Sequence, residues 1–280
     1  MIPKRIEMPV QVEEILGKLR EHGYEAFAVG GCVRDAILGR IPGDWDITTS
    51  AHPEEVKQVF GHTIDTGLQH GTVTVMRDHI GYEITTYRID GEYEDGRHPK
   101  EVVFTAELRE DLRRRDFTIN AMAYSHETGI VDIFGGAEDL AARRIRCVGD
   151  AGERFTEDAL RILRAVRFSA QLGFSIEKKT WQALCELAPS LVHVSKERVQ
   201  VELTKTLLSD RPEFIWKTEA AGLAPYISKT FPEVFAAWKK QKSCAKQSLE
   251  EKVCSKNVPA ADKDAIKTET VAQQGHGLLA

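Results

Sequence analysis

The sequence has few of the features that anchor a chain in a membrane or stabilise it outside the cell. Its 280 residues include only five cysteines: Cys32, Cys147, Cys185, Cys244 and Cys254. Their odd number and wide spacing argue against a disulfide framework and against a zinc site. No stretch approaches the roughly 18 apolar residues that span a bilayer, and the polar N-terminus lacks the apolar core of a secretory signal. We therefore expect a cytoplasmic protein with free thiols and no membrane partner.

The chain also lacks a strong net charge. The formal charge is −5, so the composition as a whole does not indicate a nucleic-acid partner, and any basic surface must be local. A hydrophobic content of 42% and a charged content of 29% are ordinary for a globular protein. A chain of this length can form one large domain or two modest ones.

The first 148 residues combine short strands with helices. Apolar spacing predicts a helix over residues 10–21, and two glycines separate a predicted strand at 24–29 from a predicted helix at 32–38. Further patterns predict a strand at 46–49, a helix that opens at Pro53, strands at 72–77 and 81–87 with a turn at 78–79, and a strand at 102–104. We expect an α+β domain with a small mixed or antiparallel sheet over residues 1–148.

The pattern changes after residue 149. Residues 159–172, 178–187 and 195–208 all show helical periodicity. The change predicts a domain boundary and an all-α domain over residues 149–238. Residues 239–280 are polar, without a usable apolar period, and predict a disordered or atypical tail.

The double glycine and a nearby acidic pair are the first candidates for chemistry. Gly30 and Gly31 allow a tight turn and let backbone N–H groups approach an anion. Asp44 and Asp46 open the next predicted strand, where side chains two apart share a face, and paired carboxylates favour a hard cation such as Mg²⁺ between them. Each signal alone fits a structural turn or two solvated acids. Together they predict a metal-dependent phosphoryl-transfer site with Asp44 and Asp46 as catalytic and metal-binding residues.

Glu83 is a candidate third carboxylate. It lies on an alternating strand whose residues Glu83, Thr85 and Tyr87 would share one face. An exposed strand acid explains Glu83 as well as a metal ligand does, so both interpretations stay open.

Four segments carry motifs that are specific in combination. They are residues 29–35 with 43–46 (VGGCVRD, GDWD), 114–122 (RRDFTINAM), 132–140 (DIFGGAEDL) and 154–168 (RFTEDALRILRAVRF). In this order, over roughly residues 20–210, they resemble the family of bacterial tRNA nucleotidyltransferases (CCA-adding enzymes) and poly(A) polymerases. That family is part of the nucleotidyltransferase superfamily that includes DNA polymerase beta.

The resemblance implies a function and a set of binding residues. It implies a nucleotidyltransferase head followed by an all-α neck and body, with Mg²⁺ as cofactor. The implied activity adds CCA from CTP and ATP to the 3′ end of tRNA. The nucleotide-binding residues that it implies are Gly31, Arg34, Arg115, Asp116, Asn120, Asp158, Arg161, Arg164 and Arg167.

Within this set, the resemblance implies that Asp158 and Arg161 select the base. The periodicity predicts a helix over residues 157–168 with one apolar stripe and with Glu157, Arg161 and Arg164 on the opposite face. The plain interpretation is a solvated face in which Arg161 pairs with Glu157 and Asp158. In the family interpretation, a carboxylate acceptor beside a guanidinium donor complements both cytosine and adenine, which each place an exocyclic amine next to a ring-nitrogen acceptor.

Several alternatives stay open. Residues 88–99 resemble the flexible loop of relatives that add the terminal A, which favours CCA addition or A addition. A poly(A) polymerase, and a non-catalytic RNA-binding protein that kept the fold, are the other candidates. Family members continue into longer helical domains, whereas the pattern here fades after about residue 226, so we expect a truncated member with weakened tRNA affinity. The oligomeric state, including a homodimer, is left open.

Overall fold

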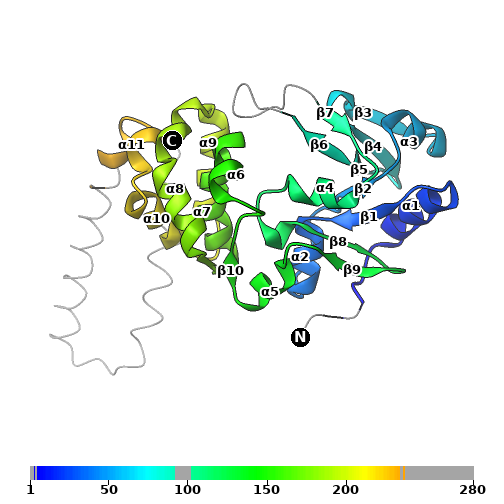
Figure 1. Ribbon diagram of the computed structural model, residues 1–280, viewed down its shortest axis with the longest axis horizontal. Helices are drawn as coiled ribbons and strands as arrows, with labels where there is room; N and C mark the ends of the chain where they lie inside the picture. The colour runs from blue at the N-terminus through cyan, green and yellow to red at the C-terminus, as the bar shows by residue number, and fades with distance from the viewer. Residues whose placement is uncertain (1–2, 4, 92–101, 234–235, 237–280) are drawn as a thin grey trace.

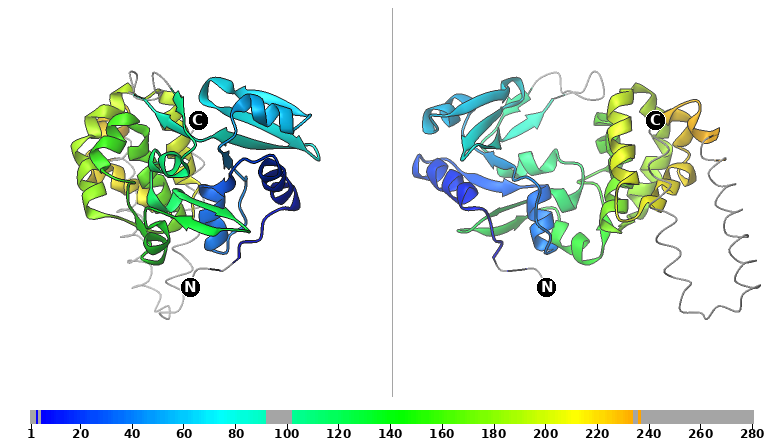
Figure 2. Two further views of the ribbon diagram at one scale, coloured as in Figure 1. Left: turned by 45° about the vertical axis from the view of Figure 1, so that its right-hand side comes forward. Right: turned by 180° about the vertical axis from the view of Figure 1, so that it is seen from behind.

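The chain folds into two parts that lie side by side. A computed structural model describes residues 3, 5–91, 102–233 and 236. An α+β part at the N-terminus, here called the head, is followed by a helical region that begins at α6 (Figures 1 and 2). This arrangement confirms the predicted fold class. The predicted tail, most of residues 88–99, Cys244 and Cys254 lie outside the described residues.

The head holds most of the strands. Its elements are α1 (Val10–Glu21), β1 (Ala26–Val29), α2 (Gly31–Ile37), β2 (Ile47–Thr49), α3 (Pro53–Val59), β3 (Thr63–Gly67), η1 (Leu68–His70), β4 (Thr72–Arg77), β5 (Ile80–Thr86), β6 (Arg88–Asp90), β7 (Val102–Phe104), α4 (Leu108–Arg113), η2 (Thr118–Asn120), β8 (Met122–Ser125), β9 (Gly129–Asp132), α5 (Gly136–Ala141) and β10 (Arg144–Ile145). The helical region contains α6 (Ala151–Glu157), α7 (Leu160–Leu172), β11 (Ser175–Ile176), α8 (Lys178–Glu186), η3 (Ala188–His193), α9 (Lys196–Leu207), η4 (Pro212–Ile215), α10 (Trp216–Ala220) and α11 (Ala224–Ile227).

One mixed sheet organises the head. Its strand order is β3-β4-β5-β2-β1-β8-β9, and every neighbouring pair is antiparallel except β2 and β5. The side chains of β1 alternate between two hydrophobic clusters. Ala26 and Ala28 belong to the larger, main cluster, whereas Phe27 and Val29 belong to a second cluster with Leu112 of α4. Both faces of the central strands β2, β1 and β8 are therefore buried.

Most of the predicted elements are confirmed to within two residues, and the misses have physical causes. Strand β8 has four consecutive buried residues, so it lacks the alternation that marks a half-buried strand. Strands β3 and β9 were also not predicted. The strand at 102–104 is present as β7, but it pairs with β6 in a separate ribbon. The turn between β4 and β5 is confirmed, with Asp78 and His79 at φ angles of 49° and 63°.

The prediction of one helix over residues 157–168 is wrong. Helix α6 ends at Glu157, Asp158 is extended with φ −144° and ψ 103°, and α7 begins at Leu160. The Asp158 carboxylate accepts a 3.0 Å hydrogen bond from the backbone N–H of Leu160, and an aspartate that bonds to nearby backbone favours such a break. The predicted solvated face is also wrong, because Arg161 is only 9% exposed.

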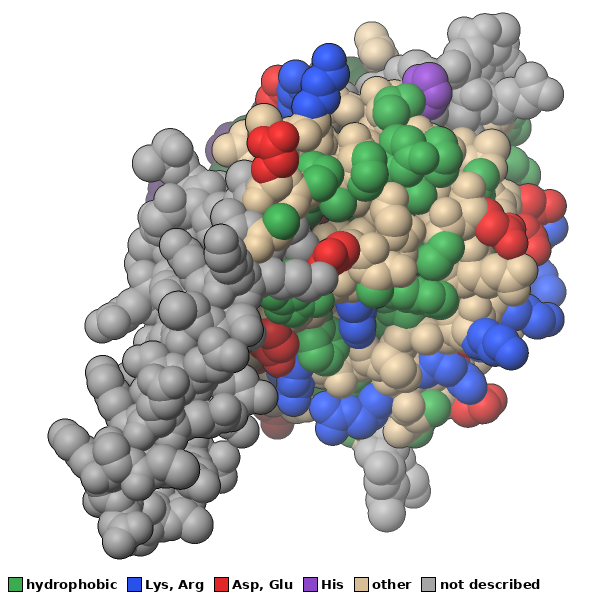
Figure 3. All heavy atoms as spheres, turned by 90° about the vertical axis from the view of Figure 1, so that its left-hand side faces the viewer, with side chains coloured by type: hydrophobic (Ala, Val, Ile, Leu, Met, Phe, Trp, Pro, Cys, Tyr) green, Lys and Arg blue, Asp and Glu red, His purple; other side chains and the backbone are tan. Residues whose placement is uncertain are grey.

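Backbone pairing joins the two parts. Strand β10 at the end of the head pairs in parallel with β11, which follows α7 in the helical region. The main hydrophobic cluster likewise includes residues from Ile6 to Ile227. On its outer face the helical region presents both apolar and basic side chains (Figure 3). None of the helices in the described ranges is long and apolar enough to cross a membrane.

Candidate active site

The loop between β1 and α2 is shaped by Gly30. Its φ of 84° and ψ of −129° lie in a backbone region that residues other than glycine rarely adopt. A Cβ at Gly30 would lie 2.9 Å from Nη1 of Arg115, so this guanidinium packs directly on the loop. Gly31 is the first residue of α2, and Arg34 follows one turn later.

Arg115 is only partly used by the protein. Its Nη2 donates a 3.3 Å hydrogen bond to Asp111, a fully buried carboxylate that Arg114 also contacts at 2.7 Å. Within the described residues, Nε of Arg115 is buried and has no hydrogen-bond partner. Donors that are left over beside a glycine loop suit an anionic ligand.

Asp44 and Asp46 lie in the extended segment just before β2 rather than within the strand. The backbone N–H of Val29 donates to the carbonyl of Asp46 at 3.0 Å, which continues the pairing with β1. Both acids line a cavity of about 940 Å³, which is also bounded by Glu83 and the N-terminal segment. The register of Ile47 with Ile84 on the parallel strands β2 and β5 places Asp46 beside Glu83.

These carboxylates form a site of concentrated negative charge. Loss of surrounding water, then the charge of Asp44, raise the pKa of Asp46 to about 6; Glu83 adds to the rise and Arg115 opposes it. Adjacent carboxylates of this kind fit a hard divalent cation, which takes oxygen ligands. Among the described residues, no three His, Cys, Asp or Glu side chains group closely enough to hold a metal ion. The role of Glu83 as third ligand therefore stays a prediction.

Four predicted nucleotide-binding residues form one connected chain of hydrogen bonds. Nη1 of Arg34 donates to Oδ1 of Asn120 at 2.6 Å, and Nδ2 of Asn120 donates to Oδ1 of Asp116 at 3.1 Å. Arg164 of α7 donates to Oδ2 of Asp116 at 2.7 Å. Burial alone would raise the pKa of Asp116, but Arg164, Asn120 and Arg161 outweigh it and lower that pKa to about 2.

Asp116 has little spare capacity to accept hydrogen bonds. Its Oδ1 also accepts from the backbone N–H of Phe117 at 2.8 Å, and its Oδ2 is contacted by both Nε and Nη2 of Arg164. A carboxylate offers about four acceptor positions, and all are in use. A contact from Asp116 to a ribose hydroxyl would replace one of these bonds. Asp116 is 7% exposed, so it is not part of a solvated surface cluster.

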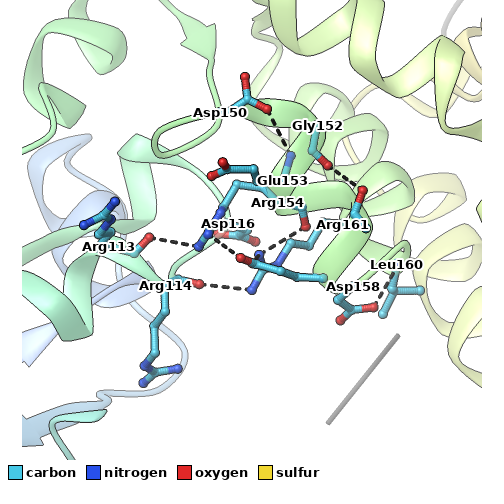
Figure 4. A network of polar contacts seen from close by, with 12 residues as sticks. Arg113, Arg114, Asp116, Asp150, Gly152, Glu153, Arg154, Asp158, Leu160 and Arg161 are labelled. Carbon is cyan, nitrogen blue, oxygen red and sulfur yellow. Dashed lines mark hydrogen bonds and ion pairs between the residues drawn. The ribbon is translucent and has the colours of Figure 1, made fainter. Parts of the chain in front are cut away.

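Of the two residues predicted to read the base, Asp158 lies in the break between α6 and α7, and Arg161 lies in the first turn of α7. Nη1 of Arg161 donates to Oε2 of Glu157 at 2.6 Å, which confirms that predicted pair, and Nη2 donates to the carbonyl of Arg114 at 3.0 Å (Figure 4). Oδ2 of Asp158 accepts a 2.7 Å hydrogen bond from Arg198 of α9. Side chains from three helices thus come together here, and Arg161 among them contacts the head.

The side chain of Arg167 hydrogen-bonds within the helical region, while Arg34 and Arg164 lie over the same Phe168 ring. Nε of Arg167 donates to Oε2 of Glu202 in α9 at 2.5 Å, and its Nη1 donates to Gln171 at 2.9 Å. The Arg167 guanidinium also lies 4.0 Å from the centroid of the Phe168 ring. These contacts hold α7 against α9, and a role for Arg167 in nucleotide binding stays a prediction.

Sequence reasoning missed three residues that support the site. Asp111 lies three and four positions before Arg114 and Arg115, a helical spacing that could have indicated the pairing. Arg198 lies forty positions from Asp158, and no local pattern links them. Arg154 lies in the motif at residues 154–168, but the motif assigns it no role. Its guanidinium contacts the head at the carbonyl of Arg113.

The comparisons with known proteins agree with this geometry. Residues 26–146 match the family model "Poly A polymerase head domain", and residues 173–230 match "Probable RNA and SrmB- binding site of polymerase A". The CCA-adding enzyme of Leuconostoc mesenteroides is 54% identical over 202 residues, which are 72% of this chain and 50% of that relative.

Solved structures of CCA-adding enzymes also match this chain. The crystal structure of the Bacillus stearothermophilus CCA-adding enzyme in complex with CTP matches with a TM-score of 0.73 and 45% identity, over 79% of this chain and 54% of that one. The Thermotoga maritima CCA-adding enzyme complexed with tRNA matches with a TM-score of 0.64 and 26% identity, over 77% and 50% of the two chains.

Sheet, glycine loop and acidic pair define the head as a nucleotidyltransferase head of the poly(A) polymerase type. The chain belongs to the family of tRNA nucleotidyltransferases and poly(A) polymerases. It spans about half the length of the curated relatives that it matches.

Proposed function

We propose that this chain adds C, C and A, from CTP and ATP, to the 3′ end of tRNA without a nucleic-acid template. The observation that carries the proposal is the hydrogen-bonded chain from Arg34 through Asn120 and Asp116 to Arg164, because it unites motifs of the head and the helical region. It lies next to the glycine loop and Arg115. Relatives that are named CCA-adding enzymes are 54% and 53% identical to this chain over 202 and 214 residues.

Asp44 and Asp46, with Glu83 beside them, are the residues that would hold Mg²⁺. The raised pKa of Asp46 supports this choice, because it reports negative charges that a cation would neutralise. When bound, such an ion would offset the charge of the triphosphate and favour loss of the proton from the acceptor 3′ hydroxyl.

The remaining residues bind and orient the nucleotide. Gly31 and Arg115, whose Nε has no hydrogen-bond partner among the described residues, would hold the triphosphate. Asp158 would accept from the exocyclic amine of cytosine or adenine, while Arg161 would donate to the ring nitrogen. Uracil and guanine present the opposite pattern, so they would form neither of these two hydrogen bonds.

The helical region would also contact RNA. Its residues 173–230 match a model described as an RNA-binding site, and basic side chains on its outer face offer charges for phosphates (Figure 3).

An incorporation assay tests the proposal. Transfer RNA lacking one, two or three 3′ nucleotides is incubated with labelled CTP, labelled ATP or both. We expect CTP to enter the substrates that lack a C, and ATP to enter only after both cytidines are in place. Incorporation of ATP without CTP into every substrate would indicate an A-adding enzyme or poly(A) polymerase instead.

A pair of variants tests the site. Asp44→Ala removes a predicted metal ligand and is expected to abolish incorporation. Asp65→Ala removes an acid of β3 whose ion pair is with Lys57, and it is expected to leave incorporation unchanged. Equal activity of the two variants would remove Asp44 from the catalytic site.

A further inference from the structure

Three arginines of the helical region reach positions 113, 114 and 116, which lie in one segment of the head. Nη1 of Arg154 donates to the carbonyl of Arg113 at 3.1 Å, and Nη2 of Arg161 donates to the carbonyl of Arg114 at 3.0 Å (Figure 4). Arg164 continues the series at Asp116, with a distance of 2.7 Å. Arg161 and Arg164 already have proposed roles in nucleotide binding, but Arg154 has none.

Arg154 also fixes the position of Arg161. Glu157 lies between them: its Oε1 accepts from Nη2 of Arg154, and its Oε2 accepts from Nη1 of Arg161. The carbonyl of Arg154 accepts a further 3.2 Å hydrogen bond from Arg161. The side chains of Arg154 and Arg161 are 12% and 11% exposed, so these charge-assisted bonds are largely shielded from water.

At its other end, this network reaches the glycine loop. Arg113 and Arg114, whose carbonyls receive the two bonds, immediately precede Arg115. The guanidinium of Arg115 packs on Gly30. Arg154, together with the direct bonds of Arg161 and Arg164, therefore ties the predicted base-binding half of the site, in the helical region, to the predicted triphosphate-binding half, in the head.

We propose that Arg154 is a positioning residue that holds the two halves of the nucleotide site in register, so that one nucleoside triphosphate binds both at once. This inference rests on the proposed function. A ligand that bridges two half-sites gains affinity from their fixed separation, and it loses that gain when the separation is free to vary. Because the acceptor is the main-chain carbonyl of Arg113, the exposed side chain of Arg113 is not needed.

The test compares a ligand that bridges both halves with one that binds only the head. Dissociation constants of ATP and of inorganic tripolyphosphate are measured for the unmodified chain, for Arg154→Ala and for the control Glu153→Ala. Glu153 is the exposed neighbour on the same helix. We expect Arg154→Ala to weaken ATP about tenfold, which corresponds to about 1.4 kcal/mol, and to leave tripolyphosphate unchanged. The Michaelis constants for ATP and CTP rise likewise, and Arg154→Lys, which keeps a donor, recovers part of the loss.

A second background sharpens the test. In Asp158→Ala, which has already lost base contacts, adding Arg154→Ala is expected to cost little more for ATP, because both changes act on the same half-site. Full additivity would overturn the proposal. Equal losses for ATP and tripolyphosphate, or ATP binding by Arg154→Ala that matches Glu153→Ala, would overturn it too. An unmodified chain that binds ATP more tightly than tripolyphosphate, yet incorporates neither CTP nor ATP, would contradict the proposed function alone.

Discussion

Arg198 holds Asp158 from a different helix: its Nη2 lies 2.7 Å from Oδ2 of Asp158. The other oxygen, Oδ1, accepts from the backbone N–H of Leu160 at 3.0 Å. Each oxygen of the carboxylate thus has one protein donor and keeps one acceptor position for a ligand. A base-reading aspartate needs this combination of fixed direction and spare capacity.

Arg198→Ala is expected to weaken base selection. Without its partner, Asp158 can turn away from the base, so kcat/KM for CTP and ATP falls about tenfold and discrimination against UTP and GTP narrows. Steady-state kinetics with all four nucleotides measure this. Lys196→Ala removes an exposed positive charge from the same helix and is the matched control. If the four nucleotides lost activity in equal proportion, Arg198 would serve stability rather than selection.

Gly30→Ala is expected to abolish activity. The new Cβ would lie 2.9 Å from Nη1 of Arg115, and the alanine would have to adopt a φ of +84°. Gly23→Ala is the control, because Gly23 has a φ of +88° with no atom within 4 Å of an added Cβ. Both variants place a side chain at a positive φ, which costs of order 1–3 kcal/mol, but only Gly30→Ala displaces Arg115. Thermal unfolding and incorporation assays separate the two effects, and similar activities in both variants would contradict this account.

Asp116→Asn is expected to destabilise the protein in a pH-dependent way. The pKa of Asp116 is lowered from 3.8 to about 2, so the ionised form contributes stability above pH 4, and this contribution is lost as the pH falls toward 2. The shift corresponds to about 2 kcal/mol at neutral pH, at 1.36 kcal/mol per pKa unit. Urea unfolding at pH 7 and at pH 2.5 measures the difference between the variant and the unmodified chain. That difference shrinks with acidification; a difference that stayed constant would contradict the assignment.

Acidification is expected to weaken the binding of Mg²⁺. A cation binds the ionised carboxylate, and Asp46, with a pKa of about 6, ionises only as the pH rises through that value. Between pH 7.5 and pH 5.5 the ionised fraction falls about fourfold, and the apparent dissociation constant rises in proportion. Calorimetric titration with Mg²⁺ measures it. Asp44→Asn removes one of the charges that raise the pKa of Asp46, so the pH dependence of Mg²⁺ binding moves to lower pH. An unchanged pH dependence would mean that Asp44 and Asp46 are not coupled.

The sequence predicts the parts of the fold that have a clear period. The strands at 72–77 and 81–87 alternate, and the helix at 178–187 has one apolar face, so local spacing is enough to place them. Strand β8 is buried on both faces and has no period to detect. The break at Asp158 depends on a hydrogen bond between its side chain and the backbone. The apolar stripe that follows Asp158 has helical spacing, so the sequence pattern does not reveal this break.

The site is predictable to the extent that its residues lie in motifs. Gly30, Asp44 and Asp116 each belong to a recognisable segment, and their chemistry suggests their roles. Partners from distant segments are not predictable in this way: Arg198 meets Asp158 only because α9 packs against α7. The spacing of a motif identifies the groups that act on a ligand, but only tertiary packing reveals the groups that orient them.

The pairing of β10 with β11 makes the two parts of the chain dependent on each other. The backbone N–H of Ser175 donates to the carbonyl of Arg143 at 3.0 Å, and that of Glu177 donates to the carbonyl of Ile145 at 2.8 Å. A chain cut between residues 148 and 149 would leave these donors and acceptors without partners and would expose an open strand edge in each fragment. Fragments 1–148 and 149–280 would therefore be poor independent domains, but they would have the means to recognise each other and reassemble as a complementing pair.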